Sequence, residues 1–504
     1  MEVKTIIGLE IHVQLKTKSK MFCSCSSEYF NDTPNSHMCP VCLGLPGALP
    51  VINKEAIKQA IRVGRALNLN INSKSRFDRK NYMYPDLFKG YQITQFEFPI
   101  TTEGYVYINM DGEENGSRPN GSRSKKIRIL RAHMEEDTAK STHYNDHTLL
   151  DGNKAGVPLL EIVSYPDMES SEEAKEYAKK IYNIVRFIQA SDCDMEKGQM
   201  RFDLNVNLKI IKKGNDSGTL GSGTWGSGTK EYRTPIVEVK NLNSFRALER
   251  ATKYEEERQL DEFKKNNEVA KAGNKVTRGW NDNLSKTFFQ RNKEESNDYR
   301  YFPEPDLPPL YLGKKFIDDA TLSVGVLPDE ALKILEDKYK IGGNVANTIV
   351  EDRLYYDYFL SELLKYKGSP SNLANWIAGY IIGLLNESGK TIPSIKTGIL
   401  AILLNFEDEG KLSSLKIKDI LKEVIVDNKN LDALINDNII ISDDGMIDTI
   451  ISTILDNNKD EVLKYKSGKE GILSYLIGQV MREMKGRGDP NAIKEKLLQR
   501  IKSI

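Results

Sequence analysis

The chain of 504 residues is longer than one hydrophobic core usually organises, so two or three domains are expected. It carries 72 Lys and Arg against 72 Asp and Glu residues. This zero net charge gives no sign of a polyanionic partner, so any contact with nucleic acid must come from local patches. No apolar run of about 18 residues and no signal segment occur, which predicts no membrane contact and a location in the cytoplasm or in a mitochondrial or plastid matrix.

Residues 1–322 predict an α+β domain built on an antiparallel sheet. Helical patterns occur around 54–67, 171–188 and 245–265. Between them lie runs rich in β-branched residues with partial alternation of apolar and polar side chains, which is typical of strands. These runs are IIGLEIHVQL, YVYINM, KKIRILRAHM, VPLLEIVSY, QMRFDLNVNLKI and TPIVEVKNL.

Helical periodicity replaces the strand pattern from LPDEALKILEDKY to the C-terminus. A polar stretch, NDNIIISDDG at 436–445, suggests a further boundary. We therefore expect an all-α domain over 323–435 and a small helical tail over 436–504.

Two segments, 111–126 and 212–231, are rich in Gly, Ser, Asn and charged residues and are typical of long hairpin loops. The second contains GTWGSGTK, which superficially resembles a phosphate-binding loop. The order of residues is wrong for that motif, because the lysine and hydroxyl residue must open a helix directly after a strand.

Four of the five cysteines form a CxC pair and a CxxC pair within residues 23–42. Two close pairs of thiolates suit one tetrahedral zinc ion, and four ligands would leave no open position, so the zinc would be structural. Incidental reduced cysteines or a redox CxxC pair are the alternatives. The predicted ligands are Cys23, Cys25, Cys39 and Cys42, whereas Cys193 stands alone and predicts an ordinary thiol.

Glu10 and His12 lie two positions apart on an apolar strand and therefore point to the same face. Buried together, they must either pair with each other or bind something, because burying them unpaired is costly. The strand by itself leaves both interpretations open.

Further acidic and amide residues recur on several predicted strands. Adjacent carboxylates repel each other unless a cation or solvent separates them, and Mg²⁺ takes carboxylates together with substrate phosphates. The set predicts a phosphate-handling floor of the sheet, against the alternative of ordinary half-exposed positions. It consists of Glu135, Glu136, Asp137, Glu161, Asp203, Asn205, Asn207, Lys240, Asn241 and Asn243.

Residues 75–95 interleave Arg76, Arg79, Lys80 and Lys89 with Tyr82, Tyr84 and Tyr91. Cations with aromatic rings suit phosphates and unstacked bases, although a solvated loop would have a similar composition.

The C-terminal stretch 464–504 carries ten Lys or Arg residues against four acidic residues. It could contact a nucleic-acid backbone or could be a solvated helix face.

Seven motifs, in order along the chain, resemble those of the GatB/GatE family, the B subunits of aspartyl/glutamyl-tRNA(Asn/Gln) amidotransferases. The resemblance runs from about residue 5 to about residue 500, with the two predicted loops as departures. The motifs are GLEIHVQL, RFDRKNYMYPDLFKGYQITQ, LRAHMEEDTAKSTH, GVPLLEIVSYPD, EVKNLNSF, DYRYFPEPDLPPL and LIGQVMREMKGRGDP.

The resemblance implies a ligase that uses ATP to phosphorylate the side-chain carboxylate of Glu on tRNA(Gln), or of Asp on tRNA(Asn). Ammonia then displaces the phosphate and leaves the amide. Family members obtain the ammonia from a separate glutaminase of the amidase type and form a heterotrimer with it and a small third subunit. The resemblance also implies a cradle-like catalytic domain over 1–322, followed by the helical domain and a tail similar to YqeY proteins.

The resemblance further assigns roles to residues of this sequence. His12, Glu136 and Glu161 would bind Mg²⁺, and Glu10, Asp203 and Asn205 would complete the catalytic floor. Five residues would face ATP or the aminoacyl end of tRNA, namely Lys80, Tyr82, Tyr84, Lys89 and Lys240. Arg482, Lys485 and Arg487 would contact tRNA.

Two rival hypotheses differ from this prediction. A non-catalytic tRNA-binding scaffold would lack one or more of the acidic residues, and all are present. The archaeal paralogue carries a long inserted domain, and neither predicted loop is long enough to be one. Whether Glu-tRNA(Gln) or Asp-tRNA(Asn) is the substrate stays open.

Overall fold

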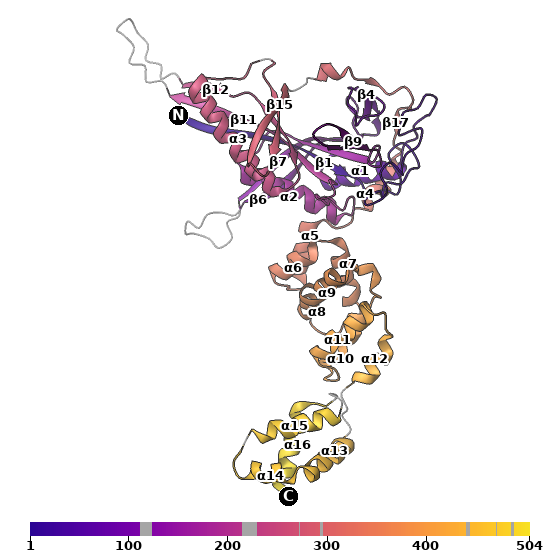
Figure 1. Ribbon diagram of the computed structural model, residues 1–504, viewed down its shortest axis with the longest axis vertical. Coiled ribbons are helices and arrows are strands. Elements are labelled where there is room, and N and C mark those ends of the chain that lie inside the picture. The colour runs from indigo at the N-terminus through magenta and orange to yellow at the C-terminus, as the bar shows by residue number, and fades with distance from the viewer. Residues whose placement is uncertain are drawn as a thin grey trace, which may run out of the picture. The chain divides into compact units, whose positions relative to one another are not determined.

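The computed structural model describes residues 1–110, 123–213, 229–271, 273–292, 296–439, 444–469, 471–484 and 488–503. They form two compact units, Met1–Pro328 and Asp329–Ile504, each described here by itself (Figure 1). Most of the two predicted loops, at 111–122 and 214–228, falls outside the described residues.

In the described part of the first unit, thirteen strands join in one sheet, and almost all neighbours are antiparallel. The one parallel pair in its path is β13 with β14. The main path runs β15-β14-β13-β11-β1-β10-β7-β5-β4-β16, with β12 beside β11 and with β6 between β7 and β2. Two small two-stranded sheets, β3 with β17 and β8 with β9, complete the strands. Their bounds are β1 (Glu2–Gln14), β2 (Asn70–Ile71), β3 (Lys74–Ser75), β4 (Asp78–Asn81), β5 (Tyr91–Thr94), β6 (Thr101–Met110), β7 (Arg123–Glu136), β8 (Lys140–His143), β9 (Thr148–Asp151), β10 (Pro158–Ser164), β11 (Met200–Lys213), β12 (Thr229–Arg233), β13 (Val237–Leu242), β14 (Val276–Asn281), β15 (Lys286–Asn292), β16 (Phe302–Pro303) and β17 (Leu310–Tyr311).

The central strand β1 shows why this sheet has one apolar and one polar face. Ile7, Leu9, Ile11 and Val13 are all buried in the core. Successive side chains of a strand alternate between faces, so the intervening residues, Glu10 and His12 among them, point the other way. The apolar face therefore serves packing, and the polar face is left for chemistry.

Three helices cover the apolar face and contribute to the same core. They are α1 (Lys54–Ala66), α2 (Ser171–Phe187) and α3 (Phe245–Asn266). Each begins at a side chain that accepts backbone N–H groups, namely Asn53, Ser170 and Ser244, which satisfies donors that the first turn leaves unpaired. The 3₁₀ turn η1 (Ser296–Tyr299) and helix α4 (Lys314–Leu322) also belong to this unit.

The second unit is helical throughout its described residues. One of its hydrophobic clusters, formed by residues such as Ile451, Leu476 and Leu497, holds the C-terminal helices together. The elements are α5 (Pro328–Lys333), the π-helix η2 (Ile334–Lys338), α6 (Gly343–Val350), α7 (Arg353–Leu363), α8 (Pro370–Trp376), the π-helix η3 (Ile377–Ile381), α9 (Ile382–Ser388), the 3₁₀ turn η4 (Ile392–Ser394), α10 (Ile399–Asp408), α11 (Ser414–Ile425), α12 (Leu431–Asn438), α13 (Asp444–Asn457), α14 (Lys459–Lys466), α15 (Ile472–Glu483) and α16 (Pro490–Ser503).

These observations confirm a mixed α and β structure with a large, mainly antiparallel sheet followed by helices. The three predicted helices and the six strand-like runs are confirmed as α1, α2, α3, β1, β6, β7, β10, β11 and β13. The cradle shape and the division at 322 and 435 stay predictions.

Candidate active site

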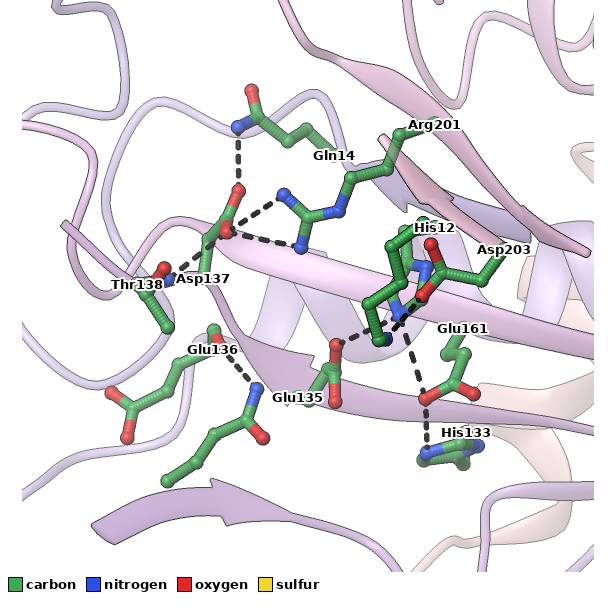
Figure 2. Close-up of polar contacts among 12 residues, drawn as sticks. His12, Gln14, His133, Glu135, Glu136, Asp137, Thr138, Glu161, Arg201 and Asp203 are labelled. Carbon is green, nitrogen blue, oxygen red and sulfur yellow. Dashed lines mark hydrogen bonds and ion pairs between the residues drawn. The ribbon is translucent and has the colours of Figure 1, made fainter. Parts of the chain in front are cut away.

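The polar face of the sheet carries a row of ionisable side chains across four neighbouring strands. In the strand register His12 of β1 lies opposite Glu161 of β10 on one side and Arg201 of β11 on the other. Glu161 in turn lies opposite His133 of β7. Residues far apart in sequence thus become neighbours because the antiparallel register aligns them (Figure 2).

His12, Glu135 and Glu161 converge so that one ligand atom from each lies within 4.8 Å of the others. Nε2 of His12 is 3.7 Å from Oε1 of Glu135 and 3.7 Å from Oε2 of Glu161. Both separations exceed a direct hydrogen bond. Glu161 Oε2 also lies 3.1 Å from Nε2 of His133. The three groups therefore surround a common point without closing on one another.

Burial sets the charges of this group. It lowers the pKa of His12 to about 4, despite the nearby Glu161 carboxylate, so the imidazole is neutral at pH 7. Burial, together with the charge of Glu161, raises the pKa of Glu135 to about 8. Burial also acts to raise the pKa of Glu161, but the hydrogen bond from His133 and the charge of Lys80 hold it well below its usual range. This set of ligands suits a divalent cation. His12 offers a neutral imidazole and Glu161 offers a carboxylate, while Glu135 keeps its proton until a cation displaces it.

The structure places Glu136 away from this point. Consecutive residues of β7 alternate between faces, so His133 and Glu135 share the polar face while Met134 and Glu136 lie on the other. The Glu136 carboxylate accepts hydrogen bonds from Lys89 Nζ and from the backbone N–H of Ile93, the latter at 2.9 Å. Figure 2 shows it directed away from His12. Of the predicted magnesium ligands, only His12 and Glu161 are brought together.

A second acidic group lies beside the first. Glu10, Asp203 and Glu238 place carboxylate oxygens within 4.8 Å of one another. Lys240 already supplies a cation there, with Nζ 2.8 Å from Oδ2 of Asp203 and 3.4 Å from Oε1 of Glu238. Burial alone would lower the pKa of Lys240, but Asp203 and Glu238 raise it, so the ammonium stays charged. The predicted residue Asn205 donates from Nδ2 to Oε1 of Glu10 at 3.0 Å and fixes that carboxylate.

Asp137, directly after the end of β7, holds several side chains next to the site in place. Its carboxylate accepts hydrogen bonds from Gln14 at 2.8 Å, Lys154 at 2.7 Å and Arg201 at 3.3 Å (Figure 2). Burial alone would raise the pKa of Asp137, but the charges of Arg201 and Lys154 hold it below its usual range. Arg201 is thereby fixed beside His12.

Cationic and aromatic side chains line the same cavity of about 490 Å³. Nζ of Lys80 lies 4.6 Å from the ring centroid of Tyr299 and 5.6 Å from that of Tyr82. The hydroxyl of Tyr84 accepts a hydrogen bond from Arg291. Predicted residues lining this cavity are Glu10, His12, Lys80, Tyr82, Tyr84, Glu135, Glu161, Asp203, Lys240, Asn241 and Asn243. Lys89 and Glu136 instead line a cavity of about 200 Å³ against the cysteine segment.

Sequence reasoning did not assign roles to several residues that meet here. Glu135 belongs to the predicted floor but not to the predicted magnesium ligands, and strand alternation is the signal that could have favoured it over Glu136 and could have found His133, since Met134 between them belongs to the core. The same alternation could have found Arg201, two residues before Asp203, and Glu238, two residues before Lys240, whereas the sequence offers no comparable signal for Arg291 and Tyr299, which reach the cavity from β15 and from η1.

The four cysteines of residues 23–42 converge as the spacing predicts. Their sulfur atoms lie within 4.8 Å of one another. The backbone N–H of Cys39 donates to Sγ of Cys42 at 3.1 Å, as in a metal-binding turn. A hydrogen bond from Cys23 lowers the pKa of the Cys42 thiol to about 4. The group fits one tetrahedral zinc ion.

Cys193 lies outside this group. Burial raises the pKa of its thiol to about 12, so the thiol is not ionised at neutral pH and is unsuited to act as a nucleophile.

Of the predicted tRNA contacts, Arg482 lies in the last turn of α15. Lys485 and Arg487 lie outside the described residues.

Among the described helices, none is both long and apolar enough to cross a bilayer.

Comparison with known proteins adds an independent line of observation. A family model described as the GatB/GatE catalytic domain matches residues 5–318, and one described as the GatB domain matches residues 357–501. The B subunit of an aspartyl/glutamyl-tRNA(Asn/Gln) amidotransferase from Treponema denticola is 41% identical over 97% of this chain and 96% of its own length. Proteins of the same description from Persephonella marina and Carboxydothermus hydrogenoformans are 39% and 37% identical, over 99% and 100% of this chain and the whole of each relative.

Proposed function

Because this chain belongs to the GatB/GatE family, the B subunits of tRNA-dependent amidotransferases, we propose that the cavity around His12 is where the family's reaction occurs. That reaction is the ATP-dependent amidation of Glu on tRNA(Gln) or of Asp on tRNA(Asn), for use in protein synthesis. The chain acts in it as one subunit of a ligase that takes its amide nitrogen from glutamine.

The convergence of His12, Glu135 and Glu161 carries the proposal. A carboxylate is a poor electrophile, and its conversion to an acyl phosphate supplies a good leaving group. Phosphoryl transfer depends chiefly on positioning and on neutralising phosphate charge. We assign Mg²⁺ to His12, Glu135 and Glu161, where it would neutralise the phosphate oxygens. Glu135 takes the place that the motif by itself had given to Glu136.

Other residues of the cavity suit the remaining parts of the substrates. Lys80, held over the rings of Tyr82 and Tyr299, and Arg201, fixed by Asp137, are cations available to phosphate groups. Tyr84 and Arg291 form a paired edge suited to a base or to the aminoacyl end of tRNA. Lys240 keeps the carboxylates of Asp203 and Glu238 compensated, so these groups do not repel the incoming substrate carboxylate.

The relatives are named as B subunits, which implies an assembly of several subunits that acts on tRNA. We assign the ammonia supply to a glutaminase of the amidase type, and the completion of a heterotrimer to a small third subunit. In keeping with this division, the buried thiol of Cys193 is unsuited to glutamine hydrolysis. The C-terminal tail, with Arg482, Lys485 and Arg487, would contact tRNA, and the protein would work in the cytoplasm or an organelle matrix.

We assign a structural zinc ion to Cys23, Cys25, Cys39 and Cys42. The cysteine segment comes after β1 along the chain. Gly44, two residues after Cys42, packs so closely against Lys89 that a Cβ added at Gly44 would overlap Cγ of that lysine. Lys89 in turn pairs with Glu136 at the end of β7. Zinc at this position would hold Lys89 and the end of β7 in place. Removing it should lower stability before it affects the chemistry.

The deciding experiment compares Glu135→Gln with Glu136→Gln in the reconstituted complex. The assay supplies Mg²⁺, ATP, mischarged tRNA and ammonium chloride in place of glutamine, so that glutaminase activity does not enter. Glu135→Gln should lower amide formation by about 100-fold or more, because it removes a carboxylate from the cation site. Glu136→Gln should lower it less, since that carboxylate holds Lys89.

Asp146→Asn, whose carboxylate is 86% exposed, is the control for the substitution itself. Full activity of Glu135→Gln at limiting Mg²⁺ would refute the assignment of the ligands. Absence of ATP-dependent amide formation by the unmodified complex would refute the proposed function as a whole.

A further inference from the structure

Lys20 is one of the largest completely buried side chains of the first unit, with 0% exposure. It lies just before the first cysteine pair. Its ammonium donates to the carbonyl oxygen of His37 at 2.7 Å and of Gly152 at 3.2 Å, and lies 3.9 Å from Sγ of Cys42. All of its donors therefore point to two neutral carbonyls and one cysteine sulfur.

The charge of Lys20 has no carboxylate partner among the described residues. Carbonyl oxygens satisfy hydrogen bonds but do not cancel a charge, and a buried charge without a counter-ion is costly. The nearest group that can become negative is the cysteine cluster. The sulfur of Cys42 lies nearest to the ammonium, and four thiolates on one Zn²⁺ carry a net charge of about −2.

We infer that Lys20 is the buried counter-ion of the metal-bound cysteine cluster and a positioning residue for it. The inference rests on the zinc site proposed above. It assigns a role outside the four ligands: Lys20 lowers the net charge of the loaded centre and donates toward the thiolate of Cys42. Groups that support metal ligands in this way commonly contribute to affinity.

The main chain of Lys20 shows why this lysine is placed for that role before any metal binds. Its N–H donates to the carbonyl of Cys25 at 2.9 Å, and its carbonyl accepts from Nδ2 of Asn53 at 3.2 Å. The backbone is thus fixed to the first cysteine pair while the side chain reaches the second. Lys20 consequently links both halves of the cluster.

The first test measures zinc binding by the full-length chain in its complex. Lys20→Met removes the charge but keeps the length of the side chain, Lys20→Arg keeps the charge, and Lys18→Met is the matched control at an exposed lysine of the same segment. Competition with a chromogenic chelator should show a loss of zinc affinity of about 10-fold to 100-fold for Lys20→Met. Lys20→Arg should lose less, and Lys18→Met should match the unmodified protein.

The second test needs no variant and decides the matter if Lys20→Met does not fold. An amine-acylating reagent is applied briefly to the protein before and after zinc is removed with a chelator, and each lysine is quantified by mass spectrometry. Lys20 should be protected with zinc and roughly 10-fold or more reactive without it, because the cysteine segment that buries the ammonium is then no longer held by the metal and the cluster carries less negative charge. Lys18 should react equally in both states.

The outcomes separate the inference from the site that it rests on. One zinc ion per unmodified chain together with unchanged affinity in Lys20→Met would overturn the role of Lys20 and leave the zinc site standing. Equal protection of Lys20 with and without zinc would overturn it as well. Absence of zinc from the unmodified chain would overturn both.

Discussion

At the scale of single residues, burial decides the charges of this site. His12 and His133 both have their pKa lowered by burial, although a glutamate carboxylate lies close to each. From composition alone, two histidines beside two glutamates would be interpreted as ion pairs. In the folded protein the imidazoles are neutral donors, which is the form that binds a metal ion. Burial therefore favours cation binding at this site, because it keeps the imidazoles of His12 and His133 unprotonated.

Asp137 allows this electrostatic account to be tested through stability. Asp137→Asn should lower the free energy of unfolding at pH 7 by roughly 3 kcal/mol, because it leaves the partly buried cations of Lys154 and Arg201 without the fully buried carboxylate that they share. The native pKa of Asp137 lies below that of the unfolded chain. Its contribution is therefore complete above the ordinary Asp pKa of about 3.9 and is lost as the pH falls below that value.

Chemical denaturation between pH 7 and pH 3 measures this effect. The difference in unfolding free energy between the unmodified protein and Asp137→Asn should shrink toward the acid end. The control, Asp146→Asn, should show no such trend, since its carboxylate is exposed. A difference that stays constant across the range would contradict the low native pKa of Asp137.

At the scale of secondary-structure elements, helix ends show how side chains distant in sequence fix the fold. Glu362, buried near the end of α7, accepts the backbone N–H of Gly398 at 2.5 Å and of Ala401 at 2.8 Å. These donors lie at the first turn of α10, where no residue of the helix itself can accept them. A side chain of one helix thus caps another.

Glu362→Ala should lower the free energy of unfolding of the helical unit by about 1–3 kcal/mol, because two buried N–H groups lose their acceptor. Thermal denaturation followed by circular dichroism measures the loss. Glu387→Ala, an exposed glutamate of α9, is the control and should change little. Equal stabilities of the two variants would show that α10 does not depend on this cap.

The same residue predicts a dependence on pH of opposite sign to that of Asp137. Burial raises the pKa of Glu362 above its unfolded value, against the two backbone hydrogen bonds that lower it. Its contribution is therefore complete below the unfolded Glu pKa of about 4.3 and declines as the pH rises through the native value. Glu362→Gln should remove this decline.

At the scale of the whole molecule, each compact unit contains hydrophobic clusters of its own. The first unit presents the proposed reaction cavity, and the second contains the basic C-terminal helices. We expect binding of the tRNA body and chemistry at its end to be separable by mutation, since the contacts belong to different units.

Combined charge reversal at Arg482, Lys485 and Arg487 should weaken tRNA binding by about tenfold or more and reduce its dependence on salt, because fewer phosphates are neutralised. Ammonia-dependent amide formation at saturating tRNA should change little. Filter binding at several salt concentrations, beside the amidation assay, measures both effects. Reversal of Lys314 and Lys315, exposed on α4, is the matched control. Unchanged affinity after reversal in the tail would place the tRNA contacts elsewhere.

Local patterns and the order of motifs were sufficient to predict the main strands and helices, the convergence of the two cysteine pairs and the family, because none of these depends on how distant segments pack. Which side chains meet could be known only from the folded chain. Alternation along β7 puts Glu135 rather than Glu136 on the polar face, but only the register of β7 against β10 brings Glu135 to the place where it meets His12. Lys20 finds its partners only when residues 37, 42 and 152 fold around it. Such long-range contacts depend on the packing of distant segments, which no local pattern of residues encodes.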